Sequence, residues 1–302
     1  MKKLFSKVSF LALGLVALSM TSCTPKAAEP VKKEVAFQMY SVRELIGDPE
    51  KFAQNHETAL KALADMGYTA VEAANYGDGK LYGLEPEEFK AQIEAAGMKV
   101  LSSHATRNLS DEELQSKDFT EALKWWDQCI DCHKRAGCKY LVIPWCSVPG
   151  SLADLQTICD FYSQVGQRVN AAGMKLGYHS HSHEYQKVED QVMLDYMIDH
   201  IAPENMFFQM DVYWAVRGGV SPVAYFKKYP GRFTMLHIKD DKEVGQSGMV
   251  GFDAIFKNMD VAGTKNWILE LEGCNAPTIL DGMKESIDYI LNADFVKPSY
   301  DE

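Results

Sequence analysis

The chain has 302 residues, of which 46% are hydrophobic and 24% are charged. These fractions are ordinary for a globular protein and exclude a disordered, collagen-like or low-complexity chain. The formal net charge is −11, and no run of five basic residues occurs. A nucleic-acid-binding protein needs a positive surface to neutralise phosphates, so we expect no nucleic-acid partner. The length suits a single eight-fold α/β barrel, which typically has roughly 250 residues.

The first 22 residues have the order of charges and apolar residues that is typical of a secretory signal peptide. Lys2, Lys3 and Lys7 form a positive start, and residues 8–18 form an apolar run that is too short for a membrane span. We therefore predict an exported protein from which residues 1–22 are removed.

The segment Met20-Thr21-Ser22-Cys23 resembles the lipobox of bacterial lipoproteins. This resemblance implies that Cys23 carries a lipid and that the protein faces the periplasm or the cell surface, held to the membrane by this anchor alone. Residues 23–33 are rich in Pro, Ala, Lys and Glu and are predicted to be a tether, followed by one domain over residues 34–302. Ordinary signal cleavage, with Cys23 as a free thiol, is the alternative.

From residue 35 onwards the chain repeats a short apolar run, a turn and a longer amphipathic segment. The apolar runs predict eight strands at 35–40, 70–73, 99–103, 140–145, 175–179, 206–211, 233–238 and 267–271. The amphipathic segments predict helices near 51–66, 86–96, 119–136, 151–172, 189–201, 221–229, 252–261 and 280–291.

Glycine follows several of the predicted helices, which supports these boundaries because glycine readily adopts the left-handed conformation that ends a helix. The glycines in question are Gly67, Gly97, Gly137, Gly173 and Gly263. Eight alternating strands and helices predict an α/β fold with a parallel (β/α)8 TIM barrel. An open doubly wound sheet is the alternative, but no glycine-rich phosphate loop follows the first strand.

Polar residues that can bind metals gather where the predicted strands end. In a TIM barrel these ends meet at one face, so residues from different strands share one mouth. The residues at this face include His104, His179, His181, His183 and Glu184, Asp211, His237, Lys239, Glu270 and Glu272. Residues two apart on a strand point the same way, so His179 and His181 should share a face, as should Glu270 and Glu272.

Carboxylates crowded into one cavity repel one another unless a cation lies among them. Imidazole and carboxylate ligands together suit a divalent ion such as Mn²⁺, Zn²⁺, Co²⁺ or Fe²⁺. We therefore predict one bound divalent metal ion, with Mn²⁺ the preferred candidate. Cys129 and Cys132, three apart in a predicted helix, lack a second pair at zinc-ribbon spacing and are interpreted as structural thiols.

Four segments resemble the sugar phosphate isomerase/epimerase family, which has the xylose isomerase-like barrel. They are Tyr178-His-Ser-His-Ser-His-Glu184, Gln209-Met-Asp-Val-Tyr213, Leu236-His-Ile-Lys-Asp240 and Ile268-Leu-Glu-Leu-Glu272. The resemblance implies a metal held by Glu, Asp, His and Glu in chain order. The last three are carried over onto Asp211, His237 and Glu270.

The first ligand of this set has two candidates, because His179 stands where the family commonly has Glu. Either His179 binds the metal, or Glu184 does, as the His-x-His-x-x-Glu form of the family suggests; we prefer Glu184. His181 then lies beside the metal as the base, with Glu270 and Lys239 as further catalytic residues. Glu272 is an alternative ligand, a residue that orients His237, or a contact for the substrate.

Epimerases of the family use two glutamates as opposing bases, and His179 here replaces the first of them. This replacement argues against an epimerisation that needs both bases. A His and Glu pair suits proton removal from one side, next to a metal-polarised carbonyl. We therefore expect an isomerase or carbon–oxygen lyase that acts on a keto-sugar or keto-glycoside, with a ketose epimerase or aldose–ketose isomerase as the alternative. The negative chain disfavours a phosphorylated sugar.

Other residues at the barrel mouth are weaker candidates for substrate binding. They are His104, His179, Trp145, Arg217 and Glu272. Two further readings of the whole chain are a non-catalytic carbohydrate-binding lipoprotein and a phosphodiesterase similar to endonuclease IV. The Asp211, His237 and Glu270 set argues against the first, and the missing basic face argues against the second.

Overall fold

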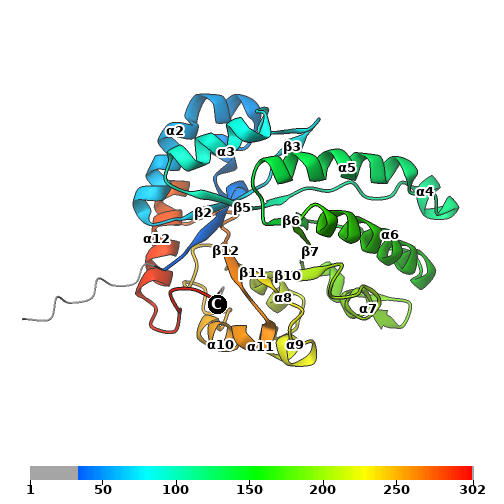
Figure 1. The fold of residues 1–302 in the computed structure, drawn as a ribbon. Helices are drawn as coiled ribbons and strands as arrows, with labels where there is room; N and C mark the ends of the chain where they lie inside the picture. Colours follow the sequence, from blue (N-terminus) through cyan, green and yellow to red (C-terminus); the bar gives the residue numbers. More distant parts are fainter. Residues whose placement is uncertain (1–32, 301–302) are drawn as a thin grey trace, which may run out of the picture. The chain divides into compact units, whose positions relative to one another are not determined.

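The computed structural model describes residues 33–300, in which eight parallel strands close into a barrel that is surrounded by helices (Figure 1). Around the barrel the strands follow the order β1 (Ala36–Gln38), β12 (Asn266–Leu269), β11 (Met235–Ile238), β10 (Phe207–Asp211), β7 (Lys175–Ser180), β6 (Tyr140–Ile143), β5 (Lys99–His104) and β2 (Ala70–Ala73). This arrangement confirms the predicted (β/α)8 barrel and excludes the open sheet.

The long helices lie on the outside of the barrel, each between two consecutive barrel strands except the last, α12, which follows β12 (Figure 1). They are α2 (Pro49–Met66), α3 (Pro86–Ala95), α5 (Thr120–Arg135), α6 (Leu152–Ala171), α7 (Met193–His200), α9 (Pro222–Lys228) and α12 (Ile279–Asn292). Shorter helices are α1 (Arg43–Ile46), α4 (Asp111–Ser116), α8 (Val212–Arg217), α10 (Phe252–Lys257) and α11 (Met259–Ala262), with 3-10 turns η1 (Met39–Val42) and η2 (His183–Tyr185).

Local sequence signals set the helix boundaries. At the start of α2 the Asp48 side chain accepts a hydrogen bond of 2.9 Å from the backbone N–H of Lys51, and Pro49 occupies the first turn. At its end Gly67 has a φ of 116° and returns its N–H to the carbonyl of Ala64. Side-chain caps of this kind satisfy backbone donors that the helix itself leaves unpaired.

The structure differs from the sequence prediction mainly in the loops. The segment expected to be one helix over 189–201 begins instead with a hairpin of β8 (Lys187–Val188) and β9 (Gln191–Val192). A second hairpin, β3 (Tyr76–Gly77) and β4 (Lys80–Leu81), was missed although Asp78-Gly79 is a strong turn signal; both turn residues have positive φ. Strand β6 ends at Ile143, because Pro144 cannot continue the ladder.

The interior of the barrel is divided into layers. Its lower part is filled by apolar side chains, namely Ala36, Ala70, Leu101, Tyr140, Val142, Phe207, Met235 and Ile268. Two residues further along four of these strands, towards the carboxyl ends, lie the buried polar side chains of Gln38, Glu72, Gln209 and His237. A register shift between Val71 and Glu72 pairs Glu72 with Ser102 on β5. Function is therefore expected above this polar layer.

The predicted signal peptide, the lipidation site Cys23 and the tether up to residue 32 lie outside the described residues. The last tether residue, Lys33, donates through Nζ to the carbonyl oxygens of Ile290, Leu291 and Ala293 at the end of α12. Among residues 33–300, no helix is both long and apolar enough to span a bilayer. The six cysteines of this part, Cys129 and Cys132 included, are free thiols.

Candidate metal centre

Four buried side chains from four neighbouring strands meet at the mouth of the barrel. They are His179 on β7, Asp211 at the end of β10, His237 on β11 and Glu270 directly after β12, and each offers one ligand atom within 4.8 Å of the others. The structure therefore brings together Asp211, His237 and Glu270, as the sequence predicts. It adds His179 to them, the candidate that we ranked second.

Asp211 has one oxygen in use and one without a partner. Its Oδ1 caps α8 by accepting a 2.8 Å hydrogen bond from the N–H of Trp214, whereas Oδ2 is buried without a hydrogen bond. Burial, reinforced by the neighbouring Glu270, raises the pKa of Asp211 to about 7. A buried carboxylate in this state needs either a proton or a cation, so the orphaned oxygen marks a place for a positive charge.

His237 lies between two carboxylates. Its Nδ1 is 3.0 Å from Glu270 Oε2, and its Nε2 is 2.6 Å from Glu72 Oε1. Burial alone would lower the pKa of His237, but Glu270 and Glu72 outweigh it and raise the pKa to about 10. A metal on Nδ1 would replace one proton and leave the Nε2–H donating to Glu72, which is the usual carboxylate support of a metal-binding histidine.

The tautomer of His179 is set by Gln209. The amide nitrogen of Gln209 donates to Glu72 Oε2 at 2.9 Å, so its oxygen faces His179 and accepts from Nδ1 at 3.0 Å. The Nδ1 of His179 therefore carries the proton, and the lone pair lies on Nε2. Burial lowers the pKa of His179 well below its usual value, so the ring is neutral and able to bind a metal.

Sequence reasoning missed Glu72, which is fully buried beneath the four residues. Besides His237, its Oε1 accepts from Gln38 at 2.9 Å and lies 3.0 Å from His104 Nε2, while Oε2 accepts from Ser102 at 2.6 Å. Burial opposes ionisation, but His104 and His237 hold the pKa of Glu72 well below its usual value. The signal was available, because a Glu within the apolar strand Ala-Val-Glu-Ala is rarely buried without a role.

Glu184, our preferred first ligand, is not part of the four-residue group. The chain turns after Ser180 into η2, and Glu184 Oε2 accepts from the backbone N–H of His181 at 2.8 Å while Oε1 accepts from Tyr178 Oη at 2.9 Å. It groups with His181 and His183 instead, where His183 Nε2 is 3.1 Å away. Glu184 thus holds the loop that carries His181.

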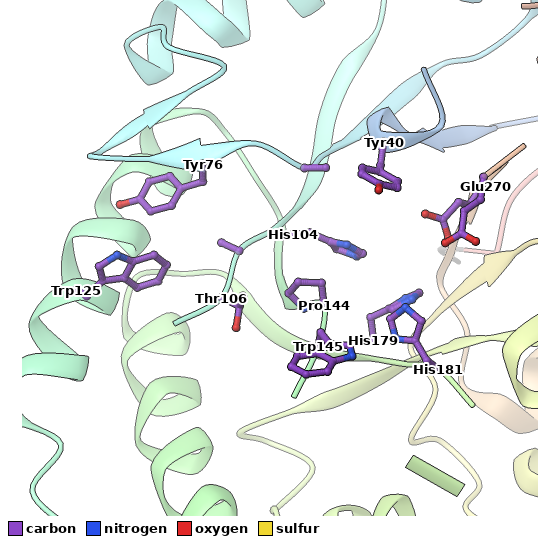
Figure 2. A pocket seen from close by; sticks show the side chains of 13 residues that line it. Tyr40, Tyr76, His104, Thr106, Trp125, Pro144, Trp145, His179, His181 and Glu270 are labelled. Atoms are coloured by element: carbon purple, nitrogen blue, oxygen red, sulfur yellow. The ribbon is translucent and has the colours of Figure 1, made fainter. Parts of the chain in front are cut away.

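A cavity of about 470 Å³ lies against two of the four residues, His179 and Glu270 (Figure 2). It is lined by His179, His181, Glu270 and Glu272 at the metal centre, and by His104 and Trp145 further out. The predicted substrate-binding residues His104, His179, Trp145 and Glu272 therefore share one space. The Trp145 side chain is 46% exposed, so its ring is available to a ligand.

His181 is well placed for proton transfer. It lines the cavity, its ring lies 4.6 Å from that of His179 (centroid to centroid), and its Nδ1 is buried without a hydrogen bond. Burial lowers the pKa of His181 to about 4, with Glu270 opposing the shift. The ring is therefore neutral near pH 7 and free to accept a proton.

Two predicted residues are not brought to the cavity. Lys239 is buried, with Nζ 3.3 Å from Glu272 Oε2 and 4.4 Å from the centre of the Tyr213 ring, so it acts on the site through Glu272. Arg217 is exposed at the end of α8 and donates to Tyr213 Oη at 2.9 Å. Its position on α8 turns the guanidinium onto the Tyr213 ring and away from the mouth.

Comparison with known proteins agrees with this fold. Residues 60–293 match the sequence family described as the xylose isomerase-like TIM barrel. The structure is similar to a sugar phosphate isomerase/epimerase from Parabacteroides distasonis ATCC 8503, with 32% identity over 88% of this chain and 100% of that chain and a TM-score of 0.79. A comparison with curated proteins gave no match.

Two more distant structures share the fold alone. The IolI protein with a bound zinc atom is 14% identical over 89% of this chain and 100% of its own, with a TM-score of 0.65. The 3-keto-D-glucoside 4-epimerase from E. coli is 18% identical over 86% of this chain and 98% of its own, with a TM-score of 0.62.

The chain therefore belongs to the xylose isomerase-like TIM barrel family, as its sequence motifs predict. Within this family it is an enzyme of the sugar isomerase/epimerase type, and its buried His, Asp and Glu group is a candidate metal site.

Proposed function

We propose that the protein is a divalent-metal-dependent enzyme that removes a proton next to the carbonyl of a keto-sugar or keto-glycoside. The metal ligands in this proposal are His179, Asp211, His237 and Glu270. The observation that carries it is the orphaned, buried Oδ2 of Asp211, on a carboxylate that offers a ligand atom within 4.8 Å of those of three further residues. When bound, the ion supplies Lewis acidity that polarises the carbonyl of the substrate.

The protein's own residues supply the proton transfer. Neutral His181 accepts the proton, and Glu184 fixes its position through the 2.8 Å hydrogen bond to its backbone N–H. In the loop after β12, Glu272 lines the cavity and is paired with Lys239, which holds a carboxylate ready to receive or return a proton. Base and acid on two sides permit isomerisation, or elimination of a group next to the acidified carbon.

Two imidazoles and two carboxylates suit Mn²⁺, Fe²⁺, Co²⁺ and Zn²⁺, and Mn²⁺ remains our first candidate. The zinc in the related IolI structure shows that this barrel accommodates such ions in another protein. The keto-glycoside class is suggested by the 3-keto-D-glucoside 4-epimerase of the same fold.

The ligand assignment is tested by metal content and affinity. We expect His179→Ala and Asp211→Asn to lose stoichiometric Mn²⁺, measured by elemental analysis after dialysis, whereas Glu184→Gln retains it. Loss of metal in Glu184→Gln with retention in His179→Ala would restore Glu184 as the ligand.

The reaction is tested with a panel of 3-keto-glycosides and free ketoses, with and without chelator. We expect turnover that EDTA abolishes and added Mn²⁺ restores, and that His181→Ala reduces kcat by at least about a hundredfold while metal content is unchanged. Turnover that is insensitive to EDTA would refute the metal-dependent mechanism. Sugar binding without any turnover would favour a carbohydrate-binding protein instead.

We also propose that the chain is exported and anchored by a lipid on Cys23, as the residues before it suggest. Cells expressing the full chain should incorporate a radiolabelled fatty acid into the protein and retain it in the membrane fraction. Cys23→Ala should release it into the soluble periplasmic fraction. Equal membrane retention of the two forms would contradict the anchor.

A further inference from the structure

The cavity above the metal centre has a second end that the proposed reaction does not use. Figure 2 shows Glu270 and His181 at one side of the cavity and Tyr76 and Trp125 at the other, with His104 and Pro144 between them. We name the part lined by Tyr76, Thr106 and Trp125 the aromatic end. A cavity of about 470 Å³ is within the range of sites that bury drug-sized ligands, so a single reacting sugar leaves this end free.

The aromatic end is held in place before any ligand binds. Tyr76 packs edge-on against Trp125, with ring centres 5.3 Å apart and planes at 89°. Trp125 in turn packs at 5.2 Å on Trp126, which is fully buried and donates through Nε1 to the carbonyl of Arg107. Rings that are already fixed lose little conformational entropy when a ligand stacks on them.

The hairpin that carries Tyr76 is also fixed. Its two-residue turn, Asp78 and Gly79, has φ values of 51° and 77°, which match the turn type that tight hairpins prefer. Tyr82 has a φ of 52°, a strained value for a bulky residue, and its buried Oη accepts from the backbone N–H of Ala74 at 3.1 Å. Strain of this kind persists where the surrounding structure enforces it, often beside functional sites.

The aromatic end is uncharged, and the cavity lining contains no lysine or arginine. Two guanidiniums belong to residues close to the lining, and both are engaged elsewhere. Arg43 stacks on Tyr40 and donates to the carbonyl oxygens of Tyr40 and Glu272, and Arg107, which follows Thr106 in the chain, is paired with Glu113. A phosphate at the aromatic end would therefore have no lysine or arginine in the lining to pair with. The group bound at the aromatic end is therefore neutral.

We propose that the substrate is an uncharged glycoside whose reacting sugar lies at the metal centre and whose aglycone ring stacks at the aromatic end, on Trp125 and Tyr76. This inference rests on the proposed function, which places the reacting sugar, and it assigns Tyr76 and Trp125 as residues that determine specificity. The aglycone presents a flat ring, either aromatic or a second pyranose.

Binding of unoxidised glycosides tests this assignment without chemistry, because they lack the ketone whose neighbouring carbon would be deprotonated. Calorimetric titration of the Mn²⁺-loaded full chain would compare methyl β-D-glucopyranoside, 4-nitrophenyl β-D-glucopyranoside, cellobiose and glucose 6-phosphate. We expect the nitrophenyl glucoside or cellobiose to bind about tenfold more tightly than the methyl glucoside, as stacking on one aromatic side chain provides. Which of the two is favoured identifies the kind of ring.

Variants separate stacking from folding. The quantity to compare is the affinity ratio, that is, the affinity for the nitrophenyl glucoside or cellobiose divided by the affinity for the methyl glucoside. Trp125→Ala and Tyr76→Ala should each bring this ratio towards one. Trp125→Phe keeps a ring and should preserve most of the ratio. Tyr229→Ala removes a half-buried ring on the outer end of α9 and should leave the ratio as in the wild type. Circular dichroism and thermal melting would show that each variant is folded, with Tyr76→Ala as the second variant if Trp125→Ala unfolds.

Several results would overturn the assignment. These are equal affinities for the three neutral glycosides, no binding of any of them, a ratio that survives both Ala variants, or tighter binding of glucose 6-phosphate. Failure of the proposed function is read separately, from metal content and EDTA sensitivity. A preference for the larger glycosides in a protein without metal-dependent turnover would sustain the aromatic end and refute the chemistry.

Discussion

Replacement of Glu72 by Gln tests whether the buried polar layer supports the metal centre. Glu72 Oε1 takes donors from Gln38, His104 and His237, and Oε2 takes donors from Ser102 and Gln209. A Gln oxygen in the place of Oε1 keeps the first group of contacts. The NH₂ of the new Gln would then take the place of Oε2, facing Ser102 and Gln209. The Ser102 hydroxyl can rotate and accept a hydrogen bond from it. The NH₂ of Gln209 can only donate, so two donors would face each other.

The magnitude of the Glu72→Gln effect follows from these contacts. One donor–donor conflict in a buried place lowers the free energy of unfolding by about 1–3 kcal/mol. A neutral amide also supports His237 less well than a carboxylate 2.6 Å away, and loss of such support typically weakens metal binding about 10–100-fold. We therefore expect a folded variant with Mn²⁺ affinity lowered by that factor.

Competitive titration of Mn²⁺ against a chelating dye would measure the affinity, and urea unfolding would measure the stability. Glu243→Gln is a matched control, because Glu243 is equally buried and accepts from the N–H groups of Asn275 and Ala276, away from the metal centre. Its variant should keep metal affinity. Unchanged metal affinity in Glu72→Gln, or an equal loss in Glu243→Gln, would refute the supporting role.

Two further predictions concern stability. Burial lowers the pKa of His133 to about 4, so between pH 6.5 and 4 the unfolded chain binds a proton here and the folded protein does not. As the pH is lowered from 6.5 to 4, the free energy of unfolding should therefore fall by about 3 kcal/mol. Urea unfolding at several pH values should show that this free energy depends less steeply on pH in His133→Gln than in the wild type. A Cβ on Gly166 in α6 would come 2.0 Å from the carbonyl oxygen of Asn205, so Gly166→Ala should lower the melting temperature, although Ala normally stabilises a helix by about 1 kcal/mol; a raised melting temperature would contradict this reasoning.

The barrel and the ends of its strands could be predicted from the sequence because both depend on local patterns. Each barrel strand is a short apolar run that is buried throughout or nearly so, and glycines such as Gly67 and Gly263 end helices in the left-handed conformation that the prediction assumed. Parallel topology then fixes which ends meet, and the resemblance to the family implied which of the residues there, Asp211, His237 and Glu270, come together.

The position of Glu184 outside the four-residue group could not be predicted, because it depends on a turn of three residues. Had the chain continued as a strand beyond Ser180, the carboxylate could have reached the mouth. Instead η2 turns Glu184 back towards Tyr178 and the N–H of His181. The energy that decides this is that of two hydrogen bonds, which no periodicity in the sequence reports.

The aromatic end escaped prediction for a different reason. Tyr76 comes from a hairpin after β2 and Trp125 from α5, so their contact joins segments about fifty residues apart. A half-buried Trp in an amphipathic helix is indistinguishable from a packing residue by sequence alone. Only the location of both rings on one cavity wall separates the two roles.

The layered interior explains how one barrel reconciles stability with a charged site. In the lower layer Phe207 fills the axis so closely that a Cβ on Gly177 would lie 2.4 Å from its ring, and the hydroxyl of Tyr140 accepts a hydrogen bond from Asn266. Two residues higher on the same two strands, Gln209 and His179 face the same axis and bond to each other. Because strand periodicity is two, the change from apolar packing to polar network takes a single repeat, and the apolar layer keeps water from reaching the network from below.

Glu72 can therefore stay ionised only by saturating its oxygens with side-chain donors. The same network places the proton of His179 on Nδ1 and holds His237 against Glu72, so burial of the carboxylate and support of the candidate metal site depend on one set of hydrogen bonds.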